Sequence, residues 1–379
     1  MSISPDATRI LASYSVNPAS HGCVPWKALN IVSAVSLEDV QPEMPVDGEK
    51  QYGSPIFTAH RSDLHNVLRE AALSVNGIGP QVQLHLSSPV SSYDTHVGTI
   101  TLVDGAVHSA DLIIVANGVH SDAASYINGF DCPVQGVDTI VMRFLIPSEK
   151  ILADPLTAPL LRRDSGHFIS YISQEGKPYL MQYDCRDSTL QNFGMYVPKP
   201  IVEGENDHTK AMQSTRLALK EAMMEFHPSL RRLCDMTEDI LPAWRITERQ
   251  PVAKCVKGRL VAIGDAAHPM RPVQGQGYSS GVQDAAVLQV LFEDVKSGGY
   301  QLIKGRLGLF QRIRQARNAA VQLYSSKPIT QNPAKLMKEE VRKWFPEERL
   351  PMHQGELNDW IMGFNAVDDA RKTLANSHG

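Results

Sequence analysis

The chain begins with two segments in which apolar residues recur at helical spacing. At the start, Ser4 precedes Pro5, an arrangement typical of an N-cap followed by the first helical residue. It predicts a helix over Ser4–Leu11. Apolar positions behind Ser62 and Asp63 predict a second helix, and His60 and Arg61 lie at its N-terminal end.

The pattern then changes to short apolar runs that favour strands. Asp104-Gly105 separates two of the runs and predicts a hairpin turn. The last run is followed by Asn117–Ser121, whose glycine allows the backbone to approach a ligand. The predicted strands are Val82–Leu86, Gly98–Val103 and Asp111–Ala116.

The middle of the chain, from about residue 137 to 254, has the pattern of a separate β-rich layer with one helix. Strand-like runs cover Thr139–Ile146 and His167–Ile172, and an amphipathic helix is expected around Lys210–Phe226. We interpret this region as a substrate domain.

A second buried strand, Arg259–Ile263, leads directly into the glycine-rich loop Gly264–Gly277, and a helix is expected from Ser279 to Leu291. The chain from Leu302 onward has a helical pattern rich in Arg and Gln. Strands that alternate with helices in this way predict an α/β fold.

Composition excludes several classes of protein. Hydrophobic residues make up 42% and charged residues 21%, as in ordinary globular enzymes, and the net charge of −4 predicts neither a nucleic-acid nor an anionic-membrane partner. The five cysteines follow no metal-ligand or disulfide spacing, so we expect no metal site. Without a secretory leader or an apolar run long enough to span a bilayer, we expect a cytoplasmic protein. Arg312, Arg314 and Arg317 are interpreted as one solvated helix face.

The strongest chemical signal is the loop Gly264–Gly277. A buried strand delivers one carboxylate, Asp265, and a loop stiffened by prolines then enters a helix N-terminus, which favours anionic or electron-rich ligands. From spacing alone, this pattern indicates a ligand-binding loop.

This loop resembles the second FAD-binding motif of the FAD-dependent aromatic hydroxylases, the flavoprotein monooxygenases of the salicylate-hydroxylase type. The resemblance implies that Asp265 contacts the ribityl chain of FAD and that Gly275, Gln276 and Gly277 admit the flavin ring. Three other segments resemble the same family: Asp111–Ser121, His60–Leu64 with Arg61 as a further FAD contact, and the tail around Arg312–Arg317 and Trp360–Ala366.

The family resemblance also implies an activity. Such enzymes hydroxylate phenolic, in some cases polyketide, substrates with dioxygen and with NADPH or NADH as the co-substrate. Arg143 and Tyr171 match positions that bind the substrate in fungal members, so we expect both to hold a small aromatic molecule. His268, at the turn after Asp265, is expected to be structural. The sequence identifies neither the particular substrate nor the oligomeric state.

The family normally opens with a βαβ unit that carries a Gly-x-Gly-x-x-Gly fingerprint for the pyrophosphate. Nothing similar precedes Ser4, and Gly77–Gly79 is interpreted as a loop. Asn117, Ala124 and Tyr278 also depart from the family pattern. We therefore expect this chain to hold FAD weakly, which leaves open a flavin-independent enzyme (isomerase, cyclase or lyase) or a binding protein that reuses the same pocket.

These observations predict a Rossmann-like FAD-binding domain that lacks its first βαβ unit, a β-sheet substrate domain and C-terminal helices. The expected boundaries are 1–136 with 255–330 for the FAD-binding domain, 137–254 for the substrate domain, and 331–379 for the helical segment.

Overall fold

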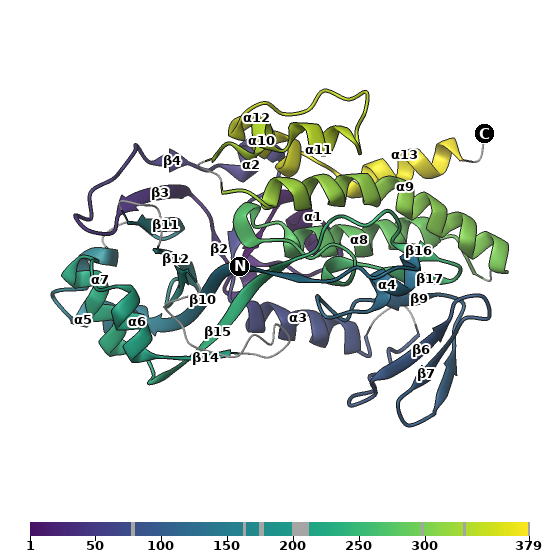
Figure 1. Ribbon diagram of the computed structural model, residues 1–379, viewed down its shortest axis with the longest axis horizontal. Coiled ribbons are helices and arrows are strands. Elements are labelled where there is room, and N and C mark those ends of the chain that lie inside the picture. Colours follow the sequence, from purple (N-terminus) through teal and green to yellow (C-terminus); the bar gives the residue numbers. More distant parts are fainter. Residues whose placement is uncertain are drawn as a thin grey trace. The chain divides into compact units, whose positions relative to one another are not determined.

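The computed structural model describes residues 1–76, 80–161, 164–173, 178–198, 212–296, 299–328 and 331–377. The chain divides into two compact units, each built from two stretches of sequence (Figure 1). Unit 1 comprises Met1–Leu68 and Gly136–Ile246, and unit 2 comprises Arg69–Gln135 and Thr247–Gly379. The mixture of helices and sheets confirms the predicted α/β class. The predicted loop Gly77–Gly79 lies outside the described residues.

Unit 1 contains one large sheet, a three-stranded sheet in the order β1-β5-β2, and helices. Its strands are β1 (Ser2–Ile3), β2 (Val24–Pro25), β3 (Ala28–Ser33), β4 (Met44–Pro45), β5 (Phe57–Thr58), β10 (Gln135–Pro147), β11 (His167–Ile172), β12 (Tyr179–Cys185), β13 (Leu190–Val197), β14 (Met212–Thr215) and β15 (Ile240–Glu248). Its helices and 3-10 turns are α1 (Pro5–Ser13), η1 (Ala19–His21), α2 (Gly48–Tyr52), α3 (Arg61–Leu73), α5 (Ser148–Ala153), η2 (Ala158–Leu161), α6 (Arg216–Ala222), α7 (Pro228–Arg232) and η4 (Leu233–Met236).

Helices α1 and α3 confirm the two predicted N-terminal helices. The Ser4 side chain accepts a hydrogen bond from the backbone N–H of Ala7 at 3.5 Å, and Pro5 occupies the first helical position. The cap satisfies one of the backbone donors that a helix start leaves without an intrahelical partner.

The large sheet of unit 1 has eight strands in the order β14-β15-β10-β13-β12-β11-β3-β4. Strand β3 pairs in parallel with β11, with Ala28 opposite His167, whereas β10, β13, β12 and β11 pair in antiparallel fashion. Because β3 belongs to this sheet, the segment before residue 69 groups with the middle of the chain. The expected boundary at residue 136 would assign residues 1–68 and 137–246 to different domains, whereas the structure places both stretches in unit 1.

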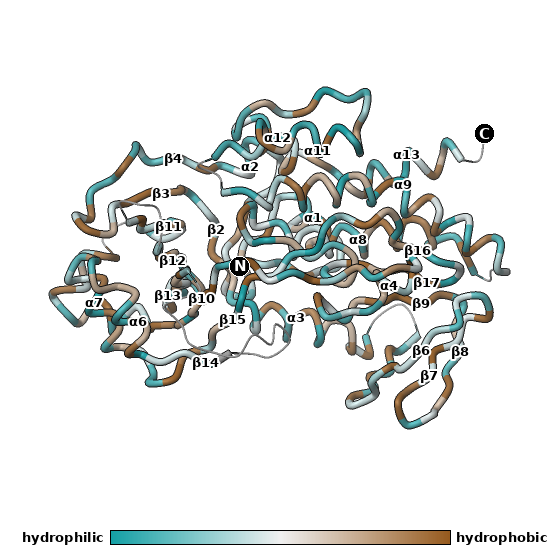
Figure 2. The backbone as a smooth tube through the Cα atoms, in the orientation of Figure 1, coloured by the Kyte–Doolittle hydropathy of each residue, from teal (hydrophilic) through white to brown (hydrophobic). Residues whose placement is uncertain are grey.

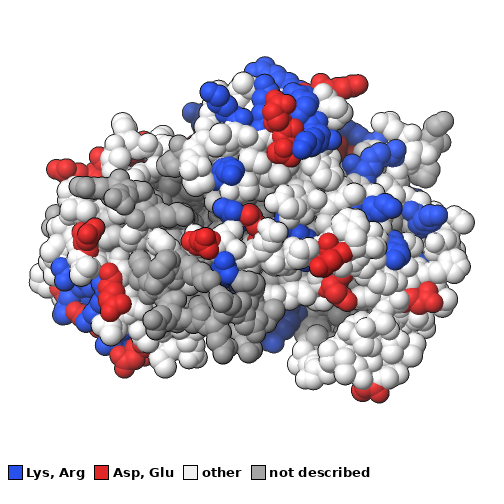
Figure 3. Space-filling view, viewed as in Figure 1, with Lys and Arg blue, Asp and Glu red and all other residues white. Residues whose placement is uncertain are grey.

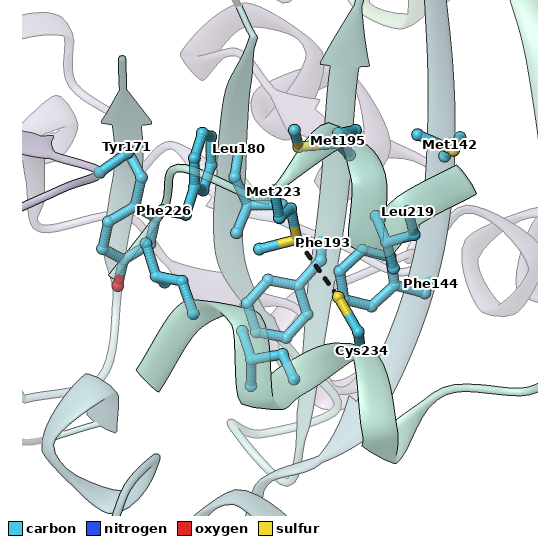
Figure 4. Packing of buried hydrophobic residues seen from close by; sticks show 14 of the residues in the cluster. Met142, Phe144, Tyr171, Leu180, Phe193, Met195, Leu219, Met223, Phe226 and Cys234 are labelled. Carbon is cyan, nitrogen blue, oxygen red and sulfur yellow. Dashed lines mark hydrogen bonds between the residues drawn. The ribbon is translucent and has the colours of Figure 1, made fainter. Parts of the chain in front are cut away.

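The two faces of this sheet differ. One cross-strand row contains Met142, Met195, Leu180 and Tyr171, and this row lies on the face that helices α6 and α7 cover (Figure 4). Phe193 and Phe144 stack there with ring centroids 5.0 Å apart. We call this side the core face and the opposite side the open face.

The turn between β12 and β13 is unusual. Arg186, Asp187 and Ser188 all have left-handed backbone conformations, with φ of 48°, 51° and 64°. The turn is fixed from two sides, because the N–H of Asp187 donates to the carbonyl of Gly22 and the Thr189 hydroxyl donates to the carbonyl of Arg186.

Unit 2 combines two small sheets with the C-terminal helices. Its strands are β6 (Val90–Asp94), β7 (Thr99–Leu102), β8 (Val107–Ser109), β9 (Ile113–Val115), β16 (Val256–Lys257) and β17 (Leu260–Ala262). Its helices and 3-10 turns are α4 (Ala123–Asn128), η5 (Gly264–Ala266), η6 (Pro272–Gln274), α8 (Gly277–Phe292), α9 (Tyr300–Ser325), α10 (Pro333–Leu336), α11 (Lys338–Arg342), α12 (Gln354–Met362) and α13 (Ala366–Asn376).

Strands β9 and β17 pair in parallel and provide the apolar centre of unit 2. The hydropathy colouring shows brown, apolar segments in these strands and in α8 (Figure 2). Leu260, Val261 and Val287 are fully buried there. The predicted strand before the loop and the predicted helix after it are therefore confirmed as β17 and α8.

Two predicted elements are wrong. Val82–Leu86 forms no strand, and its apolar side chains are exposed although they alternate with polar ones. The helix expected over Lys210–Phe226 is replaced by strand β14 and the shorter helix α6, and Lys210 lies outside the described residues. Strand β14 forms because Ser214 pairs with Leu241 of β15, a contact that helical spacing does not reveal.

Candidate functional site

The predicted ligand loop of unit 2 starts at the carboxyl edge of the parallel pair β9 and β17. Val115 pairs with Ala262, and the N–H of Ile263 donates to the carbonyl of Val115 at 3.0 Å. As a result, the turn at Asn117-Gly118 and the turn at Gly264-Asp265 emerge at the same edge. Open α/β sheets bind ligands at this position.

The glycines of this loop have defined structural roles. Gly264 and Gly275 adopt φ of +56° and +64°, a conformation that side chains disfavour. A Cβ atom at Gly277 would lie no closer than 3.9 Å to any neighbour, and the nearest is Oδ1 of Asp265. The loop therefore presents backbone rather than bulk beside the exposed Asp265 carboxylate.

A buried ionic network holds this loop in place. Asp284 of α8 is fully buried, and its Oδ2 accepts hydrogen bonds from the N–H of Gly264 at 3.0 Å and from Nε2 of His268 at 2.6 Å. Its Oδ1 accepts from Nε of Arg314 at 2.8 Å and from Nδ2 of Asn318 at 3.1 Å. Burial alone would raise the pKa of the Asp284 carboxyl, but His268 and Arg314 hold it well below its usual value.

Two predictions about basic residues are decided by this network. The structural role expected for His268 is confirmed by its contact with Asp284. The solvated helix face expected for Arg312, Arg314 and Arg317 is wrong for Arg314 and Arg317, whereas Arg312 is exposed as expected. Arg314 is fully buried on Asp284, and the guanidinium of Arg317 lies 4.1 Å from the ring centroid of Trp360 and 3.6 Å from that of Phe364.

The far end of the loop is fixed by two further contacts. Arg271 donates two hydrogen bonds of 2.6 Å to the carboxylate of Glu248, and Nε2 of Gln354 donates to Oε1 of Gln274 at 3.1 Å. Gln276 is buried, and its amide donates to the carbonyl of Gln274. Nε2 of Gln274 is buried and has no hydrogen-bond partner among the described residues, so the loop retains one unused donor.

Arg61 belongs to unit 1, where it is the first residue of α3 and is exposed. The start of this helix is anchored by Asp63, which accepts hydrogen bonds from Nε and Nη2 of Arg186 at 2.7 and 3.0 Å. These bonds from Arg186, together with a contact to His60, lower the pKa of Asp63 to about 2. The turn between β12 and β13 thus fixes the helix end that carries Arg61.

Arg143 lies on the open face of the unit 1 sheet. Its Nη1 donates to the hydroxyl of Tyr183 at 3.5 Å, and its guanidinium lies 5.3 Å from the ring centroid of Trp244. Its Nε is buried without a hydrogen-bond partner, and it forms no ion pair among the described residues. Stacked aromatic pairs share this face: Phe168 with Tyr183, and Tyr179 with Tyr196.

Tyr171 lies on the core face, opposite to Arg143. The register of the sheet places Arg143 opposite Gly194, which pairs with Met181 and then Ser170, whereas Tyr171 pairs with Leu180. The Tyr171 hydroxyl donates to Oε1 of Gln182 at 2.9 Å, and its side chain is 3% exposed. The expectation that both residues hold one substrate is therefore corrected for Tyr171, because cross-strand neighbours share a face and adjacent residues do not.

The predicted site residues thus fall into four places: the loop of unit 2 and, in unit 1, the start of α3 (Arg61), the open face of the sheet (Arg143) and its core face (Tyr171). Asp265, Gly275, Gln276 and Gly277 come together in one loop of unit 2, whereas Arg61 and Arg143 belong to unit 1. The sequence did not indicate Asp284, which lies seven residues after Gly277, two turns into the helix that follows the loop. Asp284 is the one charged residue of α8, and an acidic residue within an otherwise uncharged helix is the signal that would have identified it.

No metal-binding cluster of His, Cys, Asp or Glu occurs among the described residues. In the same part of the chain, no helix has the length and apolar character needed to cross a bilayer. On the face shown in Figure 3, acidic and basic side chains are intermixed, and both signs occur together over the region of α11 and α12.

Comparison with known proteins places this geometry in a family. A family model described as an FAD binding domain matches residues 34–304. The chain is 32% identical over 380 residues to the FAD-dependent monooxygenase phomE' of Diaporthe leptostromiformis, covering 99% of this chain and 93% of that protein. It is 27% identical over 342 residues to hispidin-3-hydroxylase of Neonothopanus nambi, covering 86% and 76%.

Solved structures share the fold at low sequence identity. CtdE in complex with FAD and a substrate aligns with a TM-score of 0.77 and 16% identity, covering 99% of this chain and 88% of that chain. A salicylate hydroxylase substrate complex aligns with a TM-score of 0.71 and 18% identity, covering 98% and 90%. Since the family model spans more than half of the chain and a relative at 32% identity covers nearly all of it, the chain belongs to the FAD-dependent monooxygenases, with FAD as the cofactor.

Proposed function

We propose that the chain hydroxylates a small phenolic or otherwise anionic aromatic substrate, with NADPH or NADH and dioxygen as co-substrates. The names of two relatives support an aromatic substrate: hispidin-3-hydroxylase, and the 6-hydroxynicotinate 3-monooxygenase of Pseudomonas fluorescens. When bound and reduced, FAD supplies the activated dioxygen for such a hydroxylation.

The loop of unit 2 fits the flavin part of FAD. Its free space at Gly277, the unused buried donor of Gln274 and the positive end of α8 suit a ring system rich in carbonyl acceptors. The exposed carboxylate of Asp265 suits the hydroxyls of a ribityl chain, since an ionised carboxylate accepts hydrogen bonds only. We assign Asp265, Gly275, Gln276 and Gly277 to this role, and Arg61 to a second FAD contact.

The observation that carries the substrate assignment is the environment of Arg143. A partly buried guanidinium that has a buried, unpartnered Nε and no ion pair is costly unless an anion binds to it. Aromatic neighbours on the same face, Tyr183 and Trp244, suit an aromatic ligand. Burial raises the pKa of Tyr183, so its hydroxyl is protonated at neutral pH and can donate a hydrogen bond to the ligand. We therefore assign phenolate or carboxylate binding to Arg143 and remove Tyr171 from direct substrate contact.

Binding of salicylate tests this assignment. Arg143→Ala should weaken salicylate binding by about 2–4 kcal/mol, the cost of removing a desolvated charged partner. Calorimetric titration measures the change. Arg245→Ala, in strand β15, is the matched control, because the Arg245 guanidinium donates to the carbonyls of Val137 and Gly136 and contacts the carboxylate of Asp138. Equal affinities of the wild type and Arg143→Ala would show that the substrate assignment is wrong.

Flavin binding tests the cofactor loop separately. Titration of the purified chain with FAD, followed by quenching of flavin fluorescence, gives the dissociation constant, and the expected weak binding stays a prediction until it is measured. Asp265→Ala should weaken binding further. An unchanged dissociation constant in this variant would contradict the loop assignment.

A further inference from the structure

Arg249 follows strand β15 and is a buried cation whose hydrogen bonds all go to backbone carbonyls. Its Nε donates to Cys132 at 2.9 Å and its Nη1 to Ala266 at 3.1 Å. Its Nη2 donates to Val119 at 3.4 Å and to Ser121 at 3.2 Å. The residue is 5% exposed, so these four carbonyls replace its hydration.

No described acidic side chain neutralises this guanidinium. Arg249 forms no ion pair among the described residues, whereas Arg271 and Arg314 of the same unit each contact a carboxylate. Burial accordingly lowers the pKa of Arg249, although an arginine remains charged at neutral pH. A buried positive charge without a counterion therefore lies directly behind the loop that carries Asp265.

The acceptors of Arg249 belong to both turns at the carboxyl edge of β9 and β17. Val119 and Ser121 follow the turn at Asn117-Gly118, and Ser121 also donates its N–H to the carbonyl of Gly118. Ala266 is the residue after Asp265, in the 3-10 turn η5. One planar guanidinium thus connects the two loops, because its donors point in fixed, divergent directions.

The turn η5 is held from its other side by an anion. The carboxylate of Asp284 accepts the N–H of Gly264, while Arg249 binds the carbonyl of Ala266. Gln322 of α9 extends the same support, since its Nε2 donates to the carbonyls of Arg249 and Pro269 at 3.2 and 3.0 Å. The backbone on both sides of Asp265 is therefore fixed by buried charges of opposite sign.

We propose that Arg249 is a positioning residue for the cofactor: it sets the spacing of the two loops that receive the flavin, and its charge favours the anionic, reduced form of the bound flavin. This inference rests on the flavin-loop assignment proposed above. A lysine at this position retains the charge but offers one ammonium group in place of a planar fork, so it cannot reach carbonyls on both loops at once. Methionine retains an unbranched apolar stem and removes the charge.

Amide hydrogen exchange of the FAD-free chain tests the spacing role. Arg249→Lys and Arg249→Met should both accelerate exchange in residues 117–121 and in residues 264–268 together. Arg245→Lys, the matched control, should leave both segments unchanged, because its carbonyl acceptors are Val137 and Gly136 of unit 1. Unchanged protection of either loop in Arg249→Lys would overturn the proposed connection between the two loops.

Flavin titration tests the role toward the cofactor. Both Arg249 variants should raise the dissociation constant for FAD about tenfold or more, a change that corresponds to ~1.4 kcal/mol. At saturating FAD, Arg249→Met should lower the midpoint potential of the bound flavin, whereas Arg249→Lys should leave the potential at the wild-type value. If Arg249 had only a structural role, the two variants would not differ in midpoint potential while both bind FAD more weakly.

Asp265→Ala distinguishes the two ways of failing. If FAD affinity falls in Asp265→Ala but stays at the wild-type value in Arg249→Lys, the flavin loop is correctly placed and the inference about Arg249 is wrong. If neither variant changes FAD affinity, the loop assignment itself is wrong, and with it the inference.

Discussion

The core face of the unit 1 sheet and the loop region of unit 2 are both fully packed, but different forces fix them. Behind the sheet, Phe193, Met195 and Leu180 are excluded from water and contact one another and the covering helices (Figure 4). Behind the loop, Asp284 and Arg314 are equally buried and contact each other as ions. Apolar packing tolerates adjustment, whereas a buried ion pair requires its partner. The site that holds the cofactor loop is therefore the less replaceable of the two.

The largest effect is expected from removing Asp284. Asp284→Ala leaves Arg314 buried without its carboxylate and should lower the free energy of unfolding by about 3–5 kcal/mol. Denaturant unfolding at pH 7 measures the loss. Glu340→Ala is the control, because Glu340 pairs with Lys343 at the surface, where 50% and 67% of the two side chains are exposed. A loss in Asp284→Ala as small as in this control would show that the buried pair contributes no more than a surface pair.

The same contact predicts how stability depends on pH. The folded-state pKa of Asp284 lies below its unfolded value near 4, so its contribution is present above about pH 4 and declines as the pH falls further. The difference in unfolding free energy between the wild type and Asp284→Asn should therefore narrow below about pH 4. A difference that widens on acidification would contradict the depressed pKa.

A comparable loss of stability is expected when an aromatic ring is removed from the core face of the unit 1 sheet. Phe193→Ala removes a ring that stacks on Phe144 and should lower the free energy of unfolding by about 3–5 kcal/mol through the cavity it leaves. Phe193→Leu should recover more than half of that loss, whereas no conservative replacement should rescue Asp284. Phe130→Ala, at a ring that is 62% exposed, is the control. If conservative replacements of Phe193 and of Asp284 recovered stability equally, the apolar core and the buried ion pair would tolerate substitution alike.

A smaller effect is expected at Tyr171. Tyr171→Phe leaves the buried Oε1 of Gln182 without this donor and should lower the free energy of unfolding by about 1–3 kcal/mol. Salicylate affinity should not change, because Tyr171 faces the core. Arg143→Ala should show the opposite pattern, with altered affinity and little loss of stability. Calorimetric titration with salicylate and denaturant unfolding of both variants measure the two quantities. Weaker salicylate binding by Tyr171→Phe would show that Tyr171 contacts the substrate directly.

The smallest effect is expected at the surface pair of Asp63 and Arg186. Asp63→Asn should lower the free energy of unfolding by about 0–1 kcal/mol at pH 7, since both side chains are partly solvated. Because the pKa of Asp63 is about 2, any contribution should persist at pH 5 and decline as the pH falls below about 4. Glu70→Gln on the same helix is the control, and a loss above 2 kcal/mol would show that this pair does more than anchor the helix start.

Local signals in the sequence predicted the elements that bear the cofactor loop. Ser4 as an N-cap, the apolar run that became β17 and the glycine-rich turn behind it depend on neighbouring residues, so their outcome could be anticipated. Strand β13 was not predicted, because its buried Gln191 and Asn192 break the apolar pattern. The side-chain amide of Gln191 is satisfied by Ser148, 43 residues away, and by Asp184.

The errors arose where a distant residue decides the environment. Arg314 has the same local sequence context whether or not Asp284 lies against it, and the two are 30 residues apart. Likewise, the faces of Arg143 and Tyr171 depend on a register that runs through two intervening strands, β13 and β12. Shifting any one of these pairings by a single residue would have brought both side chains to the same face.

The left-handed turn at Arg186, Asp187 and Ser188 limits how this sequence can drift during evolution. Only glycine, asparagine and aspartate adopt such a conformation readily, and β-branched residues are disfavoured most. Of the three positions, only Asp187 now holds one of these residues. Relatives that retain the two-strand hairpin should therefore vary here within a narrow set of small or polar residues, and an insertion that relaxes the turn should appear together with loss of the acidic residue at Asp63.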